Sequence, residues 1–268
     1  MNREVRAAND NPGALREAVS KVPAVTLGFW IIKIAATTLG ETGGDWVTMS
    51  LNLGYLIGTA IFAVFFVMLV LGQVSSNRLH PILYWATIVA TTTLGTTLAD
   101  FFDRSMGVGY PGGVAVIVVL LLASLFTWHR SEGSVSIQSI TTPRAEWFYW
   151  VTILFSQTLG TALGDWTAGN DRGGMGLGYE YAALIFGGAL LLVAVAYFWT
   201  RISRTTLFWL AFVLTRPLGA TVGDFLDKPL AQGGLNLSRL YASLALLAFM
   251  ALCVLLIPQR PAPAGHGA

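Results

Sequence analysis

The chain has 268 residues, of which 54% are hydrophobic and 11% are charged, and its formal net charge is +2. Soluble domains carry about a quarter charged residues, so this composition excludes an ordinary soluble domain and predicts a membrane protein. Its only cysteine, Cys253, excludes an internal disulfide and a thiolate metal site. We find no catalytic triad, phosphate-binding loop or nucleic-acid-binding motif. The chain is therefore interpreted as neither an enzyme nor a nucleic-acid-binding protein.

A polar segment, residues 1–21, opens the chain and contains charges of both signs without an early apolar run. A secretory signal peptide needs such a run, so the segment is predicted to be an uncleaved cytoplasmic tail. From residue 22 onward, apolar runs recur at about the twenty-residue length that crosses a bilayer.

One motif occurs four times along this apolar region. In each copy a tryptophan lies nine residues before a Leu-Gly pair and fifteen residues before an aspartate. A Gly-rich link and a second apolar run follow, so each copy is predicted to form a helical hairpin. The tryptophans are Trp30, Trp85, Trp150 and Trp209, and the aspartates are Asp45, Asp100, Asp165 and Asp224.

The copies also alternate in sequence. Copies one and three have Asp-Trp, whereas copies two and four have Asp-Phe-x-Asp followed by a cation. This pattern predicts an all-α membrane protein of eight transmembrane helices, in two parallel, pseudo-symmetric halves related by an axis along the membrane normal. The predicted units are a first half at 22–128, a cytoplasmic linker at 129–146, a second half at 147–257 and a cytoplasmic tail at 258–268.

Basic residues crowd the tails and the links between hairpins, which predicts that both termini are cytoplasmic. Each repeat tryptophan closely follows such a link and is interpreted as an aromatic residue of the membrane interface. With a rise of about 1.5 Å per residue, the motif aspartates lie roughly 22 Å from these tryptophans along the helix, in the outer leaflet of the bilayer. Glu41, eleven residues after Trp30, lies near the middle of the bilayer.

Carboxylates at such depth usually face a bundle interior or a water-filled cavity. Oxygen-rich sites suit hard divalent cations such as Mn²⁺, Mg²⁺ and Ca²⁺, and the hydroxyl groups of Thr42, Thr97 and Thr221 are candidate additional ligands. Alternatively, the small residues form a packing seam and the aspartates cap the outer helix ends. The predicted metal ligands are Glu41, Asp45, Asp100, Asp165 and Asp224.

Two cations lie within the apolar runs and are candidate gating residues or charge partners. Lys33 is three residues past Trp30, so we expect its side chain to extend to the cytoplasmic surface. Arg216 is seven residues past Trp209 and cannot easily lose its proton, so it is predicted to pair with an acid, Glu41 first.

The segment KIAATTLGETGGDWVTMSLNLGY resembles a signature of bacterial membrane proteins labelled only as uncharacterised membrane-anchored proteins, and the resemblance covers all four hairpins. It implies no particular activity. A weaker similarity relates LGETGGDW to exchangers for manganese or calcium that carry Glu-x-Gly-Asp in two repeats. This chain departs from that pattern because Glu41 and Asp45 are four residues apart instead of three, and because copies two to four lack the glutamate.

The sequence thus predicts a multi-pass protein of the bacterial inner membrane that transports a small divalent cation, with Mn²⁺ as the first choice, in exchange for protons. Glu41 is the candidate for proton coupling because, of the predicted ligands, it lies nearest to the middle of the bilayer. The lipid bilayer and the transported cation are the expected partners, and no cofactor is predicted. Two alternatives stay open: a membrane scaffold that transports nothing, and a transporter of an anion or organic solute bound through Arg216.

Overall fold

The computed structural model describes residues 21–107, 109–137, 140 and 142–262, and this part of the chain is almost entirely helical. Two π-helical turns, Trp46–Ser50 and Phe101–Ser105, continue α2 and α4 beyond the motif aspartates. Apart from Lys21 and residues 258–262, the two predicted tails lie outside the described residues. The eight α-helices of the described chain are α2 (Leu27–Asp45), α3 (Gly54–Ser75), α4 (Pro81–Asp100), α5 (Tyr110–Glu132), α6 (Pro143–Ala168), α7 (Tyr179–Trp199), α8 (Arg204–Asp227) and α9 (Arg239–Leu256).

Local sequence signals mark where several helices begin. The hydroxyl groups of Thr26 and Thr142 accept hydrogen bonds from backbone N–H groups three residues later, and so cap α2 and α6. Ser203 caps α8 in the same way. Proline lies in the first turn of α4, α5 and α6, where its missing N–H leaves no helical bond unmade. At the ends of the predicted linker 129–146, α5 continues to Glu132 and α6 begins at Pro143.

The first helices of the four repeats form a closed ring. Each of them packs against two others, in the order α2, α4, α6, α8 and back to α2. Their N-terminal ends meet in aromatic contacts, such as that of Tyr84 with Trp150. Their C-terminal ends meet through ion pairs of the motif aspartates. The four inner helices therefore run in the same direction around one axis.

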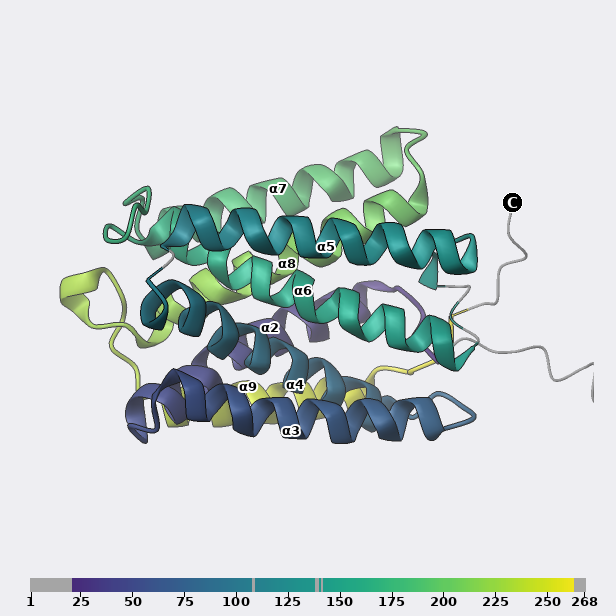
Figure 1. Ribbon diagram of the computed structural model, residues 1–268, viewed down its shortest axis with the longest axis horizontal. Helices are drawn as coiled ribbons and strands as arrows, with labels where there is room; N and C mark the ends of the chain where they lie inside the picture. The colour runs from purple at the N-terminus through teal and green to yellow at the C-terminus, as the bar shows by residue number, and fades with distance from the viewer. Residues whose placement is uncertain (1–20, 108, 138–139, 141, 263–268) are drawn as a thin grey trace, which may run out of the picture.

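The second helices of the repeats lie outside this ring (Figure 1). Each packs on the first helix of the following repeat: α3 on α4, α5 on α6 and α7 on α8. The last outer helix, α9, packs on α2 of the first repeat, which closes the circle. The segments before α2 and after α9 are also joined, because the backbone N–H of Ala24 donates to the carbonyl of Arg260 at 2.8 Å.

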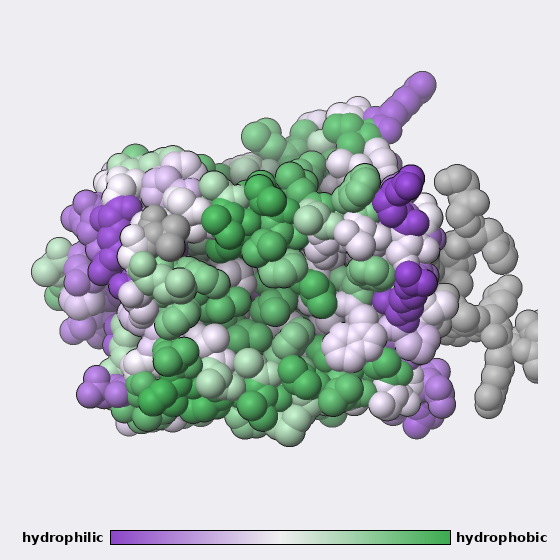
Figure 2. All heavy atoms as spheres, in the orientation of Figure 1, coloured by the Kyte–Doolittle hydropathy of each residue, from purple (hydrophilic) through white to green (hydrophobic). Residues whose placement is uncertain are grey.

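Six of the described helices, all except α2 and α6, are long and apolar enough to cross a membrane. The outer helices expose mainly hydrophobic side chains, whereas α4 and α8 are mostly buried. Figure 2 shows hydrophobic residues over the middle of the visible face and hydrophilic residues toward both ends. In α2 and α6, buried polar side chains such as Lys33, Glu41 and Gln157 lower the hydropathy. The chain is a multi-pass membrane protein.

The Leu-Gly pair of each repeat lies at a close contact between neighbouring inner helices. A Cβ atom added to its glycine would lie within 1.9–2.9 Å of the residue three positions before the corresponding glycine of the next repeat. Glycine is required because only it lets the two backbones approach so closely. The contacts are Gly40 with Thr92, Gly95 with Gln157, Gly160 with Arg216, and Gly219 with Thr37.

Three of the repeat tryptophans do not face the membrane interface, so that interpretation is wrong for them. Trp85, Trp150 and Trp209 are buried in the aromatic cluster at the N-terminal end of the ring. The reason is that these positions face neighbouring repeats rather than lipid. Trp209, for example, packs edge-on against Trp128 of α5, with ring centroids 5.9 Å apart.

Candidate functional site

Four levels of buried side chains follow one another along the inner helices, each four residues and about 6 Å beyond the last. Every level takes one pseudo-equivalent residue from each inner helix. We name the levels after one member or after their common residue. They are the Lys33 level (Lys33, Ile88, Ile153, Phe212), the Arg216 level (Thr37, Thr92, Gln157, Arg216), the Glu41 level (Glu41, Thr96, Thr161, Ala220) and the aspartate level (Asp45, Asp100, Asp165, Asp224).

Arg216 is fully buried and contacts the three other inner helices. Its Nη2 donates to Glu41 Oε2 on α2 at 2.9 Å, to Thr161 Oγ1 on α6 at 2.6 Å, and to Thr96 Oγ1 on α4. The guanidinium also donates to two backbone carbonyls of its own level, at 3.3 and 3.4 Å. The predicted pair of Arg216 with Glu41 is confirmed, and the guanidinium fills the centre of the ring at the Glu41 level.

Lys33 does not extend to the cytoplasmic surface, so that prediction is wrong. Its side chain is fully buried, and its Nζ has no hydrogen-bond partner among the described residues. The Nζ atom lies 4.2 Å from the ring centroid of Phe212, where a protonated amine would interact favourably with the aromatic face. The reason is its position in the ring: the pseudo-equivalent residues Ile88 and Ile153 also face the interior.

At the aspartate level, Lys228 joins the fourth repeat to the first. Its Nζ lies 2.5 Å from Asp45 Oδ2 and 2.9 Å from Asp224 Oδ1. Burial by itself lowers the pKa of the Lys228 ammonium, but these two carboxylates outweigh burial and raise the pKa well above its ordinary value. Arg239 adds weaker contacts, at 3.8 Å to Asp45 and 3.3 Å to Asp227. We call Asp45, Asp224 and Lys228 the Lys228 junction.

Arg104 joins the second repeat to the third in the corresponding way. Its Nε lies 2.6 Å from Asp100 Oδ1, and its Nη2 lies 3.4 Å from Asp165 Oδ2. We call these three residues the Arg104 junction. It has no third carboxylate at the Glu41 level, because the residue equivalent to Glu41 in the third repeat is Thr161. The two junctions therefore share a plan and differ in their acids.

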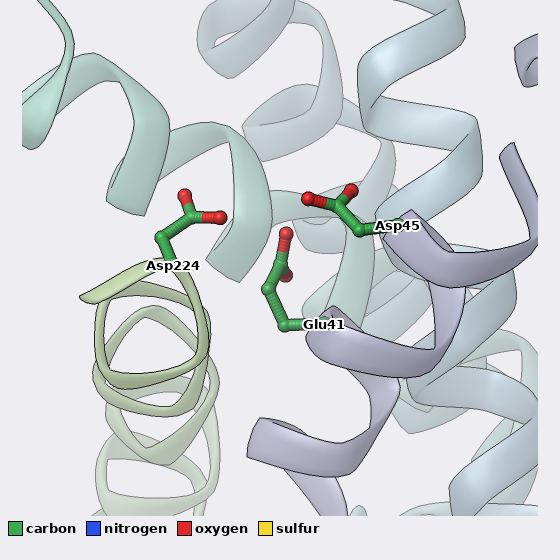
Figure 3. A group of neighbouring side chains, drawn as sticks. All are labelled: Glu41, Asp45 and Asp224. Carbon is green, nitrogen blue, oxygen red and sulfur yellow. The ribbon is translucent and has the colours of Figure 1, made fainter. Parts of the chain in front are cut away.

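Three of the five predicted ligands come together: the two aspartates of the Lys228 junction and Glu41. Carboxylate oxygens of Glu41, Asp45 and Asp224 lie within 4.8 Å of one another, and all three side chains are buried. Figure 3 shows these carboxylates extending from α2 and α8 toward a common region. Asp45 Oδ1 is buried and has no hydrogen-bond partner among the described residues. Oxygen ligands of this kind suit Mn²⁺, Mg²⁺ or Ca²⁺. The other two predicted ligands lie at the Arg104 junction.

The three predicted threonine ligands are engaged elsewhere. The hydroxyl groups of Thr97 and Thr221 donate to backbone carbonyls of their own helices, at 3.2 Å and 2.8 Å. The Thr42 hydroxyl accepts a hydrogen bond from Ser243 Oγ on α9 at 2.8 Å. Only the contact of Thr42 with Ser243 joins two helices, and none of the three contacts links a threonine to the three-carboxylate group.

Sequence reasoning did not assign the cations of the aspartate level to the site. Arg104 and Lys228 follow a motif aspartate by four residues, and side chains at this spacing are neighbours on a helix. That spacing was the available signal for the first contact of each cation. The second contact of each cation is with an aspartate of another repeat, so it depends on which inner helices are neighbours in the ring. Arg239 had a signal too, because it replaces the tyrosine found in the Gly-rich link of the other repeats.

Carboxylates outnumber cations toward the C-terminal ends of the four inner helices. In the part of the chain that the structure describes, four cations lie within ion-pair distance of these acids: Arg104, Arg216, Lys228 and Arg239. An isolated buried carboxylate is costly in an apolar medium, so the excess must be neutralised by protons or by bound cations. Among the described residues, seven buried carboxylates lie at this end of the ring: those of Glu41, Asp45, Asp100, Asp103, Asp165, Asp224 and Asp227.

Comparison with known proteins identifies the repeat but not an activity. The family model described as Repeat of Unknown Function (DUF347) matches residues 28–78, 83–134, 148–203 and 207–257, which are the four repeats. No curated protein matches the chain. No solved structure matches it either.

Proposed function

We propose that this chain, which belongs to the DUF347 repeat family, is a membrane transporter of a small cation rather than an enzyme. The cation binds to Glu41, Asp45 and Asp224. One observation carries the proposal: carboxylate oxygens of these three buried residues lie within 4.8 Å of one another inside a ring of membrane helices. Intramembrane carboxylates in such positions commonly mark ion pathways.

The excess of buried carboxylates supports a cation rather than an anion as the substrate. A cation entering the ring lowers the electrostatic cost of these acids, whereas an anion raises it. The candidate ligands Glu41, Asp45 and Asp224 offer only carboxylate oxygens, which favours a hard cation over a soft one. Mn²⁺ is our first choice among the divalent cations. We propose that it is transported in exchange for protons.

Glu41 connects the cation site to the centre of the ring. Its carboxylate is shared between the three-carboxylate group and the guanidinium of Arg216. A cation or a proton bound at Glu41 weakens its attraction to Arg216. Because Arg216 fills the ring at this level, occupancy of Glu41 couples to the position of the guanidinium. We assign proton coupling to Glu41 and gating to Arg216 on this basis.

The proposed topology has eight membrane crossings, in two parallel halves related by an axis along the membrane normal. The ring supports it, because α2 and α6 lie between helices that are apolar enough to cross a membrane. The segments joined through Ala24 and Arg260 place both ends of the helical region on one side. We propose that this side is the cytoplasm, as the basic residues of the links indicate. We also propose that the membrane is a bacterial inner membrane.

A scaffold that transports nothing is the second candidate, and the ion pairs favour it. Arg104, Lys228 and Arg216 each tie at least two inner helices together. A transporter of anions or organic solutes through Arg216 has less support. The guanidinium already donates to Glu41, Thr96 and Thr161.

The deciding experiment uses the purified full-length protein, first in detergent and then in lipid vesicles. Mn²⁺, Mg²⁺ and Ca²⁺ are each tested for an increase in the unfolding temperature and for flux into vesicles. We expect Mn²⁺ to stabilise and to cross. The variant Asp224→Asn should lose both effects while keeping a folded helical spectrum. If no cation stabilises the wild type and none crosses, the scaffold is the correct function.

A further inference from the structure

We infer that Lys228 is an internal competitor for the cation site: its ammonium occupies the place of the substrate at Asp45 and Asp224, and the substrate must displace it. This inference rests on the proposed function. It also assigns the cation site to one junction of the ring, between α8 and α2.

The geometry at Lys228 is that of a single positive centre held between two carboxylates. One atom, Nζ, makes both contacts, at 2.5 Å to Asp45 and 2.9 Å to Asp224. A lysine ammonium is a compact point charge, and in this respect it resembles a small bound cation. The three-carboxylate group thus already accommodates a positive charge, which arrives on a side chain rather than from solution.

Lys228 and a divalent cation cannot share these oxygens. A divalent cation binds carboxylate oxygens at about 2.0–2.6 Å, depending on the metal. Two positive centres on the same two oxygens would lie only a few ångströms apart and would repel each other strongly in a buried site. Binding of the substrate therefore requires the ammonium to leave.

Asp227 provides an alternative partner for the displaced ammonium. Its carboxylate is buried, and neither of its oxygens has a hydrogen-bond partner among the described residues, although Arg239 lies at 3.3 Å. Lys228 itself follows the last residue of α8, and its four-carbon side chain is flexible. The ammonium can thus exchange one carboxylate neighbour for another without crossing the ring.

The Arg104 junction does not have the same property. Arg104 contacts its two aspartates through two different atoms, Nε and Nη2, so one small cation cannot reproduce both contacts at the same places. Glu41 also has no acidic counterpart there. The Arg104 junction is therefore a fixed cross-link, and Arg104 is the matched control for Lys228.

The test measures the apparent Kd of the full-length protein for Mn²⁺ by titration calorimetry in detergent. If Lys228 occupies the site most of the time, the competent fraction is small, and Lys228→Met should tighten Mn²⁺ binding about tenfold or more. Arg104→Met should leave the Kd unchanged. Lys228→Arg keeps the charge with a larger, forked donor group, so it should bind Mn²⁺ no more tightly than the wild type.

Two outcomes separate the inference from the proposed function. If the wild type binds Mn²⁺ and Lys228→Met binds with the same or weaker affinity, Lys228 is no competitor and the proposed site stands without it. If neither protein binds any of the three divalent cations, the proposed function itself is overturned. Should Lys228→Met fail to fold, an Mn²⁺ affinity of Lys228→Arg above that of the wild type would also overturn the inference.

Discussion

The Lys228 junction and the Arg104 junction occupy equivalent places in the ring, and each joins an even repeat to the repeat that follows it. In both, a cation contacts the motif aspartate four residues before it and also the motif aspartate of the following repeat in the ring. Three of their differences are in polar residues: Glu41 occupies the position of Thr161, Lys228 that of Arg104, and Arg239 that of Tyr110. The comparison shows how duplication can preserve a cross-link in one place and convert its copy into a candidate binding site.

The proposed difference between the two junctions rests on the kind of cation in each. Arginine is always charged and spreads its donors over a planar fork, which suits a permanent bridge between two acids. Lysine concentrates its charge at one flexible atom. Substituting the cations, the acids and the small residues of each junction tests the distinction.

The largest effect is expected from removing the bridging cations. Arg104→Met leaves Asp100 and Asp165 without their cation and should lower the free energy of unfolding by about 3–5 kcal/mol, as for other broken buried ion pairs. Lys228→Met should cost less, because Arg239 remains 3.8 Å from Asp45. Chemical unfolding in detergent measures both. Equal losses would contradict the idea that only one junction is a fixed cross-link.

The next effect concerns metal-dependent stability. Asp45→Asn removes a ligand of the proposed site, so at a hundredfold excess of Mn²⁺ over Kd it should abolish about 2.7 kcal/mol of stabilisation. Asp165→Asn makes the equivalent change at the Arg104 junction and should retain the Mn²⁺ response. Thermal unfolding with and without Mn²⁺ reads out both variants. Loss of the response in both would mean that the aspartates act as one site.

A smaller effect is expected from the small residues beside each junction. A Cβ on Gly223 would lie 2.7 Å from Glu41 Cβ, whereas the equivalent residue of the second repeat is Ala99. Gly223→Ala should cost about 1–3 kcal/mol through overpacking. It should also weaken Mn²⁺ binding, because Glu41 must move. Ala99→Gly serves as the control: its calorimetric Kd for Mn²⁺ should equal that of the wild type.

The smallest effect should come from the second aspartate of the even repeats. Asp227 lies 3.3 Å from Arg239, which is partly exposed, so Asp227→Asn should cost about 0.2–1 kcal/mol. Asp103 is buried and has no ion-pair or hydrogen-bond partner among the described residues. Asp103→Asn should therefore leave the unfolding temperature unchanged or raise it. A marked fall on Asp103→Asn would show that this carboxylate has a partner in the folded protein.

The sequence by itself determined the repeats, the helices and the presence of intramembrane acids. These features are local: apolar runs of membrane-spanning length, prolines and hydroxyl residues at helix starts, and a motif of constant spacing are all read along one segment. The pair of Arg216 with Glu41 was also predictable, because a permanently charged guanidinium in an apolar run must find an acid.

Only the tertiary structure decided which residues share a site. Residues from different repeats meet because each outer helix packs on the following repeat and α9 returns to α2. That order divides the four motif aspartates between two junctions and places Glu41 beside Asp224 instead of among all four. It also buries Lys33 against Phe212. Spacing along a helix fixes the depth and face of a side chain, but the choice of neighbouring helix depends on packing between segments far apart in the chain.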